Sequence, residues 1–69
     1  MSIIYSEHSL KRMKQRGITE LEVNYILNHP IYLKNSFAGR KEACGQIKNR
    51  VIRIEFIQEE SYIKIITII

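Results

Sequence analysis

Three side chains near the start of the sequence have the types and the spacing to bind a phosphate group. His8, Arg12 and Arg16 stand four positions apart. Because an α-helix has about 3.6 residues per turn, this spacing places all three on one flank of a helix. Arginine forks fit phosphate oxygens, and histidine can transfer a proton near neutral pH. The spacing alone fits better with a solvated basic face opposite the apolar Leu10 and Met13, so both interpretations stay open.

A second group of candidates lies in the last third of the chain. Arg53 stands among apolar residues near the centre of an expected strand, where it is either an anion-binding group or an exposed partner of a glutamate. Tyr62 is expected on the outer sheet face beside Lys64, where it could transfer a proton, although an aromatic cross-strand contact is the commoner role. Thr67 fits an ordinary β-branched strand residue on the inner face.

The sequence argues against a metal or cofactor site. All seven acidic residues are Glu, which weakens a two-metal nuclease because hard cations require clustered carboxylates. His8, His29 and Cys44 lack the spacing of zinc ligands. His29 suits the C-terminal end of a helix, where a cation is favoured, and Cys44 suits a small half-buried apolar position in a strand.

The elements that must position these groups begin with two helices. Ser6 is a suitable N-cap for a helix over 7–16, which Gly17 would end. Thr19 and Glu22 match a capping box, which starts a second helix over about 20–28. Val23, Ile26 and Leu27 form one apolar side of that helix, and Leu21 and Tyr25 form another. We therefore expect the second helix to lie between the first helix and a sheet.

The remaining sequence has the alternation and turn residues of strands. The expected strands, in chain order, are 3–5, 31–37, 40–47, 50–57 and 62–69, and the first of them is short. We expect an α+β domain of order β-α-α-β-β-β-β, with two helices on one face of a four-stranded antiparallel sheet. The last hairpin would place Glu55 opposite Lys64. The outer face would be a mixture of charged and apolar residues, which suggests that something covers part of it.

Length and charge bound the class of protein. A chain of 69 residues has room for one domain, 1–69. It carries 11 Lys and Arg against 7 acidic residues, a formal charge of +4, which favours nucleic acid or an acidic protein as a partner. A single cysteine and the lack of a signal-peptide pattern indicate a cytoplasmic location. The apolar C-terminus is too short and too polar to span a membrane.

Several motifs together resemble a known family. They are HSLKRMKQRGIT from His8 to Thr19, the N-x-P at Asn28–Pro30, Gly39-Arg40, Gly45 and the closing IKIITII. These features resemble a bacterial and archaeal domain-of-unknown-function family (number 4258), grouped with RelE- and BrnT-like toxins in the barnase–colicin–RelE type of ribonuclease fold. The resemblance runs nearly end to end. It implies a RelE-like two-helix layer on an antiparallel sheet, and an RNase active site.

The resemblance implies metal-independent RNA cleavage by attack of the 2′-hydroxyl on the adjacent phosphorus. Such chemistry requires a base, an acid and cations around the phosphoryl oxygens. His8, Arg40 and Arg53 would be the catalytic groups. The substrate-binding groups would be Arg12, Arg16, Tyr62, Lys64 and Thr67. No second clear proton-transfer group is evident.

Three functions compete at this point. The first is a ribonuclease toxin silenced by an acidic antitoxin protein that covers the outer face. The second is a non-catalytic module of the same fold that binds RNA or a protein. The third is a homodimer joined through the edge of the C-terminal strand, because an open apolar edge at 62–69 would otherwise invite aggregation.

Overall fold

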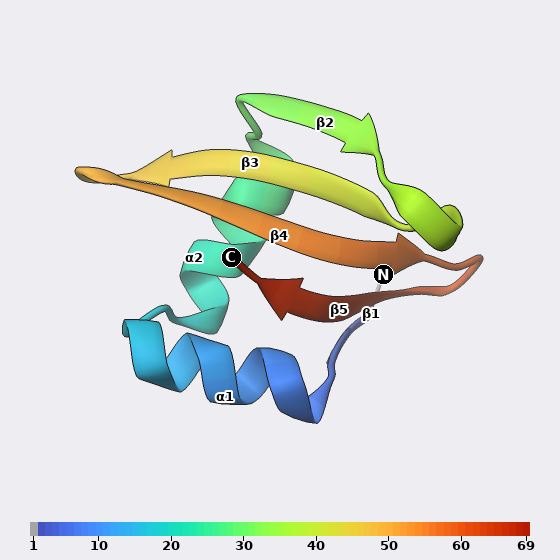
Figure 1. Ribbon diagram of the computed structural model, residues 1–69, viewed down its shortest axis with the longest axis horizontal. Coiled ribbons are helices and arrows are strands. Elements are labelled where there is room, and N and C mark those ends of the chain that lie inside the picture. Colours follow the sequence, from blue (N-terminus) through green and yellow to red (C-terminus); the bar gives the residue numbers. More distant parts are fainter. Residues whose placement is uncertain (1) are drawn as a thin grey trace.

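The computed structural model describes residues 2–69 and consists of two helices packed against one five-stranded sheet (Figure 1). In chain order the elements are β1 (Ser2–Tyr5), α1 (Glu7–Arg16), α2 (Glu20–Asn28), β2 (Tyr32–Asn35), the 3-10 turn η1 (Phe37–Gly39), β3 (Lys41–Ile47), β4 (Arg50–Gln58) and β5 (Tyr62–Ile68). The expected α+β class is confirmed, and both helices have the expected bounds. The expected strand 31–37 is shorter at both ends, and Ala38 and Gly39 turn the chain at positive φ.

Local capping accounts for the helix bounds. The Ser6 side chain accepts a hydrogen bond from the backbone N–H of Ser9, and Gly17 adopts the left-handed conformation that ends α1. Thr19 and Glu22 form the expected capping box at the start of α2. The Thr19 backbone N–H, which donates to the Glu22 carboxylate, lowers the pKa of that carboxyl.

The sheet has the order β1-β5-β4-β3-β2 and is mixed, because β1 pairs parallel with β5. The expected sheet of four antiparallel strands was therefore one strand too small. Ile3 and Tyr5 of β1 pack against the hydrophobic core, which explains why even a four-residue strand joins the sheet. Residues 62–65 of β5 face β1, so this part of the last strand is not the open edge on which a homodimer was expected.

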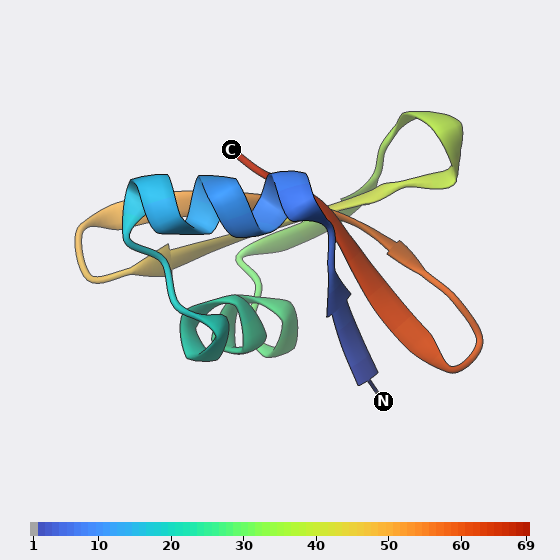
Figure 2. The ribbon, with the colours of Figure 1, turned by 90° about the horizontal axis from the view of Figure 1, so that it is seen from below.

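Helix α1 closes the rest of the β5 edge. The Ser6 hydroxyl donates to the Ile66 carbonyl at 2.8 Å, and Arg12 Nε donates to the Ile68 carbonyl at 3.2 Å. Figure 2 shows α1 level with the sheet and α2 on one side of it. Because the Ser6 and Arg12 hydrogen bonds go to carbonyls at the strand edge, α1 lies beside β5. Helix α2 covers the inner face of the sheet.

The core lies between α2 and the inner face of the sheet. It is built from Met13, Ile18, Val23, Ile26, Ala43, Ile52, Ile54, Phe56, Ile65 and Ile68. A Cβ added at Gly45 would lie 2.7 Å from two side-chain carbons of Ile26, so glycine lets α2 approach β3 closely. The second apolar side of α2 is not covered, since Leu21 is 81% exposed and Tyr25 is also exposed. The expectation that α2 would be enclosed on two sides was wrong.

A β-bulge changes the register of the last hairpin. Glu55 is opposite Thr67 and Phe56 is opposite Ile65, so Ile66 has no partner in β4. Lys64 is opposite Ile57, and the expected Glu55–Lys64 pair does not form. Thr67 consequently lies on the outer face with Glu55, whereas Ile68 is buried in the core. The expected inner position of Thr67 was wrong because strict alternation cannot anticipate one unpaired residue.

Candidate anion-binding site

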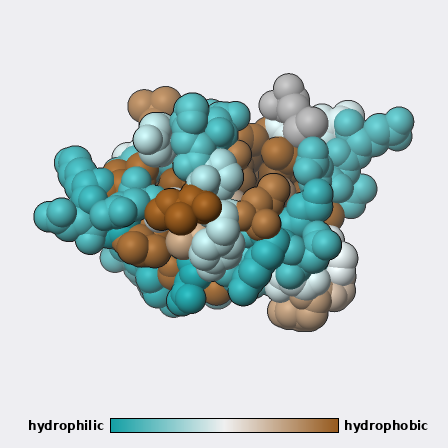
Figure 3. All heavy atoms as spheres, turned by 90° about the horizontal axis from the view of Figure 1, so that it is seen from above, coloured by the Kyte–Doolittle hydropathy of each residue, from teal (hydrophilic) through white to brown (hydrophobic). Residues whose placement is uncertain are grey.

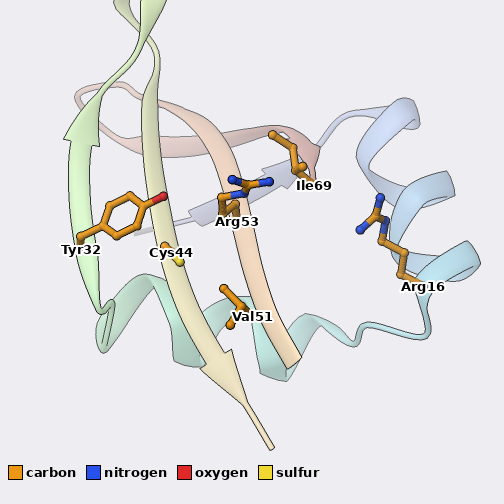
Figure 4. Close-up of a pocket in the computed structure, with 6 residues that line it drawn as sticks. All are labelled: Arg16, Tyr32, Cys44, Val51, Arg53 and Ile69. Atoms are coloured by element: carbon orange, nitrogen blue, oxygen red, sulfur yellow. The ribbon is translucent and has the colours of Figure 1, made fainter. Parts of the chain in front are cut away.

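The outer face of the sheet carries a hollow of about 560 Å³ (Figure 4). None of the helices among residues 2–69 covers this face of the sheet (Figure 2). The lining residues of the hollow are Arg16, Tyr32, Cys44, Val51, Arg53 and Ile69. Four of these form one row across the strands, in the order Ile69, Arg53, Cys44 and Tyr32. The register of the sheet therefore builds the floor, and α1 adds Arg16 at one side.

Two guanidinium groups face this hollow from different elements. Arg53 is exposed near the middle of β4, and Arg16 is exposed in the last turn of α1. Figure 4 shows the Arg16 side chain directed toward the sheet and Arg53 between it and Tyr32. Within residues 2–69, neither arginine forms an ion pair with a carboxylate. Two unneutralised cations beside one hollow are the arrangement that an anion requires.

A hydrogen bond from strand β4 holds the backbone of Arg16 in place. The Arg50 guanidinium, at the start of β4, donates a hydrogen bond to the Arg16 backbone carbonyl. This carbonyl belongs to the C-terminal end of α1, where a cation is favoured by the helix dipole. Arg50 thus holds the end of α1 against β4 and keeps the Arg16 side chain beside the hollow.

Tyr32 forms the opposite wall and is a neutral hydrogen-bonding group. Its hydroxyl donates to Glu42 Oε2 at 2.6 Å, and this hydrogen bond is the main cause that raises the pKa of Tyr32 to about 12. A tyrosine with such a pKa keeps its proton at neutral pH. Tyr32 offers an aromatic ring to a ligand, but it does not act as a base there.

The cysteine in the floor is more deeply placed than the sequence predicts. Cys44 is buried, with 5% of its surface exposed, and it is a free thiol. It stands directly opposite Arg53 on the neighbouring strand. Its place in the row is that of a small apolar residue that leaves room above the floor.

The expected catalytic residues do not come together. His8 is exposed in the first turn of α1, two helical turns and about 12 Å along the axis from Arg16, and it does not line the hollow. Arg40 instead pairs with Glu55, with Nη1 and Oε1 3.4 Å apart. Of the three residues His8, Arg40 and Arg53, only Arg53 reaches the hollow.

The expected substrate-binding residues are also divided. Arg16 lines the hollow, whereas Arg12 lies one turn away and binds the Ile68 carbonyl. Thr67 is opposite Glu55, in the row next to the hollow. Tyr62 and Lys64 lie further along β5, opposite Ser2 and Ile4 of β1. The register therefore places these last two residues at the far end of the outer face.

Sequence reasoning missed Tyr32, Val51 and Ile69 as site residues. Tyr32 could have been found by aligning β2 with β3, because its register places it opposite Cys44, next to Arg53. Val51 stands two residues before Arg53 and so shares its face. No signal in the sequence places Ile69 beside Arg53, since that neighbourhood depends on the bulge at Ile66.

The fold and the site together define a small α+β domain with a cationic hollow on an uncovered sheet face. A family model described as "Domain of unknown function (DUF4258)" matches residues 5–69, and the chain belongs to this family. Comparisons with curated proteins and with solved structures gave no match.

Two further findings concern metals and membranes. Residues 2–69 contain no group of three or more His, Cys, Asp or Glu side chains that could hold a metal ion. In the same part of the chain, neither helix has the length and apolar character needed to cross a membrane.

Proposed function

We propose that this chain is an RNA-binding domain with a RelE-like fold, and that the outer-face hollow binds the phosphate backbone of a single RNA strand. The observation that carries this proposal is the meeting of Arg16 and Arg53 at one hollow without a carboxylate partner for either. Arginine forks bind phosphate oxygens through paired, charge-assisted hydrogen bonds. The formal charge of +4 adds long-range attraction for a polyanion.

The size and walls of the hollow favour a single strand. Its volume of about 560 Å³ falls in the range of about 300–1,000 Å³ that is typical of small-ligand pockets. This space suits one nucleotide unit and not a double helix. Tyr32 supplies an aromatic wall, and single-stranded nucleic acids stack their bases on such rings beside basic grooves. In this arrangement the two arginines hold phosphate and the tyrosine ring contacts a base.

A second candidate is the ribonuclease toxin that the family resemblance implies. Arg16 and Arg53 favour it, because cations around a scissile phosphate would stabilise the charge that develops during 2′-hydroxyl attack. The hollow itself provides no group suited to proton transfer at neutral pH, since Tyr32 keeps its proton and His8 lies outside. Binding therefore ranks above cleavage, and metal-independent cleavage is the activity to test next.

An acidic antitoxin protein would bind the same outer-face hollow as RNA. An acidic amphipathic segment would meet Arg16 and Arg53 with its carboxylates and the exposed Val51 and Ile69 with its apolar side chains. Such a segment would compete with RNA for the two arginines. Competition between an acidic peptide and RNA would support this partner.

The binding proposal is tested with a fluorescent single-stranded RNA oligonucleotide in low salt, using anisotropy. Arg53→Ala and Arg16→Ala should each weaken binding by about ten- to a hundredfold, because a hydrogen bond to a charged group contributes about 1.5–3 kcal/mol. The slope of affinity against salt should fall by about one for each removed phosphate contact. Lys11→Ala is the matched control, since Lys11 is an exposed cation of α1 that does not line the hollow. Equal weakening by Lys11→Ala and Arg53→Ala would show that binding is not at the hollow.

The same samples separate binding from cleavage. RNA is incubated with the wild-type chain in EDTA and its fragments are resolved on a gel. Specific fragments with 2′,3′-cyclic phosphate ends, lost in Arg53→Ala, would establish the ribonuclease. Loss in His8→Ala as well would show that the imidazole reaches the RNA from outside the hollow. Intact RNA with retained binding supports the non-catalytic module.

A further inference from the structure

Strand β2 is an open edge of the sheet within residues 2–69, because it pairs only with β3. The Ser36 backbone N–H donates to the Arg40 carbonyl at 2.7 Å, so the groups of Ser36 face β3. In an antiparallel ladder, alternate residues face the same neighbour. The backbone groups of Leu33 and Asn35 therefore point away from the sheet. These are free donors and acceptors, ready for another strand.

Large apolar side chains gather along this edge. Ile31 is 62% exposed, Leu33 is 56% exposed and Phe37 is 68% exposed. Figure 3 views the molecule from above Figure 1, and so from the side on which β2 lies, and it shows apolar surface gathered between hydrophilic groups. Proteins usually shorten, charge or cover an edge strand, because an open apolar edge pairs with other chains. The only charged side chain in β2 is Lys34.

The opposite edge of the sheet is different. Ile3 and Tyr5 of β1 are partly buried against the core, and Ile4 is the one exposed large apolar residue of that strand. In β2 all four residues are exposed. The apolar surface that lacks a partner is thus concentrated at the β2 edge and not at β1.

We propose that two copies of this chain dimerise by antiparallel pairing of their β2 strands, about a two-fold axis at Leu33. In this register Leu33 is opposite Leu33 of the second copy, and the two residues exchange both backbone hydrogen bonds. Ile31 is then opposite Asn35 of the second copy on the same face as the leucines. The paired strands bury apolar surface and satisfy the outward groups of Leu33 together.

The charges of the strand fit this self-pairing. The register places Lys34 opposite Tyr32 of the second copy, on the outer face. Within one copy, Lys34 already lies 5.6 Å from the Tyr32 ring centroid and 3.8 Å from a Glu42 carboxylate oxygen. Because the Tyr32 hydroxyl bonds Glu42, each lysine would also approach the carboxylate of the other copy. A second copy therefore complements the edge in its apolar residues and in its charges.

A two-fold axis of this kind stands perpendicular to the sheet and keeps both outer faces on one side. The dimer would have one continuous sheet, with two hollows on the same surface and Tyr32 of each close to the axis. The pairing is isologous and closed, so it leaves only the short β1 strands as edges and does not propagate into fibres. The proposal does not depend on the nature of the ligand in the hollow.

The oligomeric state tests this proposal by sedimentation equilibrium over a concentration series. The wild-type chain should approach a mass of about 16.4 kDa, twice the 8.2 kDa of one chain. Leu33→Lys should weaken the dimer by roughly tenfold or more, because it replaces the central apolar pair with two like charges directly opposite each other. Leu33 is exposed in the single chain, so this change leaves the core intact.

Leu21→Lys is the matched control. Leu21 is even more exposed, at 81%, but it lies on α2. The same change of residue type there should leave the mass of the dimer unaltered. A wild-type mass of 8.2 kDa at every concentration, or equal effects of the two variants, would overturn the proposal.

Hydrogen exchange gives a second readout that requires no variant. The amide protons of Leu33 and Asn35 point outward in one chain and should exchange rapidly at low concentration. The Leu33 amide should become protected as the concentration rises, whereas that of Lys34, which faces β3, should be protected throughout. Unchanged rapid exchange at Leu33 in the dimeric fraction would place the contact elsewhere and overturn the proposal.

Discussion

The two faces of the sheet differ in what they require of their side chains, and strand β4 shows the difference within a few residues. Ile52, Ile54 and Phe56 point inward and are buried, whereas Arg53 points outward and is exposed. The inner face is packed so closely that a Cβ at Gly45 would collide with Ile26. The outer face leaves a hollow of about 560 Å³.

The outer face itself contains two neighbouring rows with different electrostatics. In the row of the hollow, Arg53 has no carboxylate partner among the residues described. In the next row, Glu55 is 8% exposed and is covered by its ion pair with Arg40. Two arginines that look equivalent in sequence therefore differ in their surroundings: Arg40 neutralises the buried Glu55 carboxylate, and Arg53 has no carboxylate partner in the described part of the chain. This difference is why we propose Arg53, and not Arg40, as the anion-binding group. Inner-face changes should alter stability, and hollow changes should alter binding.

The largest expected effect on stability is at the inner face. Gly45→Ala should destabilise the fold by about 1–3 kcal/mol, the usual cost of overpacking, because the new methyl group meets Ile26 near the helix backbone. Urea unfolding followed by circular dichroism measures this change. Gln46→Ala is the control, since Gln46 is the exposed next residue of β3. An unaltered unfolding midpoint in Gly45→Ala would show that α2 does not lie so close to β3.

An intermediate effect is expected at the paired row. Glu55→Gln should destabilise the fold by about 1–2 kcal/mol, less than the 3–5 kcal/mol of a broken buried pair, because about a third of the Arg40 side chain is exposed. The same unfolding experiment applies. Glu60→Gln removes an equal charge from an exposed position in the turn before β5 and should have no effect. If the two variants unfold alike, the Arg40–Glu55 pair contributes nothing to stability.

A still smaller effect on stability is expected in the hollow. Arg53→Ala should change the free energy of unfolding by no more than about 0.5 kcal/mol, as is usual for exposed sites, although we expect it to weaken RNA binding. Measuring the free energy of unfolding and the RNA affinity on one preparation distinguishes the row of Arg53 from the row of Glu55 most clearly. A large loss of stability would make Arg53 a structural residue and would remove the contrast with Arg40.

The smallest effect concerns the proton of Tyr32. Its pKa of about 12, raised mainly by the Glu42 hydrogen bond, should appear as a late step in an ultraviolet titration of the tyrosines. Because the folded pKa exceeds the ordinary tyrosine value of 10.0, the stability that this hydrogen bond contributes is complete below about pH 10 and is lost as the pH rises toward 12. Glu42→Gln should move the Tyr32 step to lower pH. A titration that does not change would mean that the hydrogen bond is absent in solution.

Local signals in the sequence predicted the helices well, because their ends are decided by neighbouring residues. Ser6, Gly17 and the Thr19–Glu22 capping box act within one turn of the chain. It was harder to predict that β1 joins the sheet, because this four-residue strand is held by long-range contacts with β5. The exposed side of α2 was also hard to predict. Its apolar residues Leu21 and Tyr25 indicated a buried side, but both are exposed.

The site was only partly predictable for a similar reason. Arg16 was selected for its spacing along the helix and Arg53 for its place among the apolar residues of a strand, and both line one hollow. The same spacing also grouped Arg16 with His8, although eight positions on a helix separate these two residues by about 12 Å. The ion pair of Arg40 could not be foreseen, because its partner, Glu55, is 15 positions away and is brought near only by the β3–β4 register. The catalytic role expected for Arg40 stays a prediction.

The unpaired Ile66 in β5 has a consequence for the last residues of the chain. If Ile66 instead took a paired position opposite Glu55, the side chains after it would exchange sides: Thr67 would point into the core, and Ile68 would point toward water. Ile69 would leave the rim beside Arg53 at the same time. Deletion of Ile66 itself should be tolerated, because the strand would then alternate regularly from Ile65, with Thr67 still opposite Glu55 and Ile68 still opposite Ile54. The arginine-lined cavity would keep Ile69 at its rim, so the bulge can be removed without changing either face.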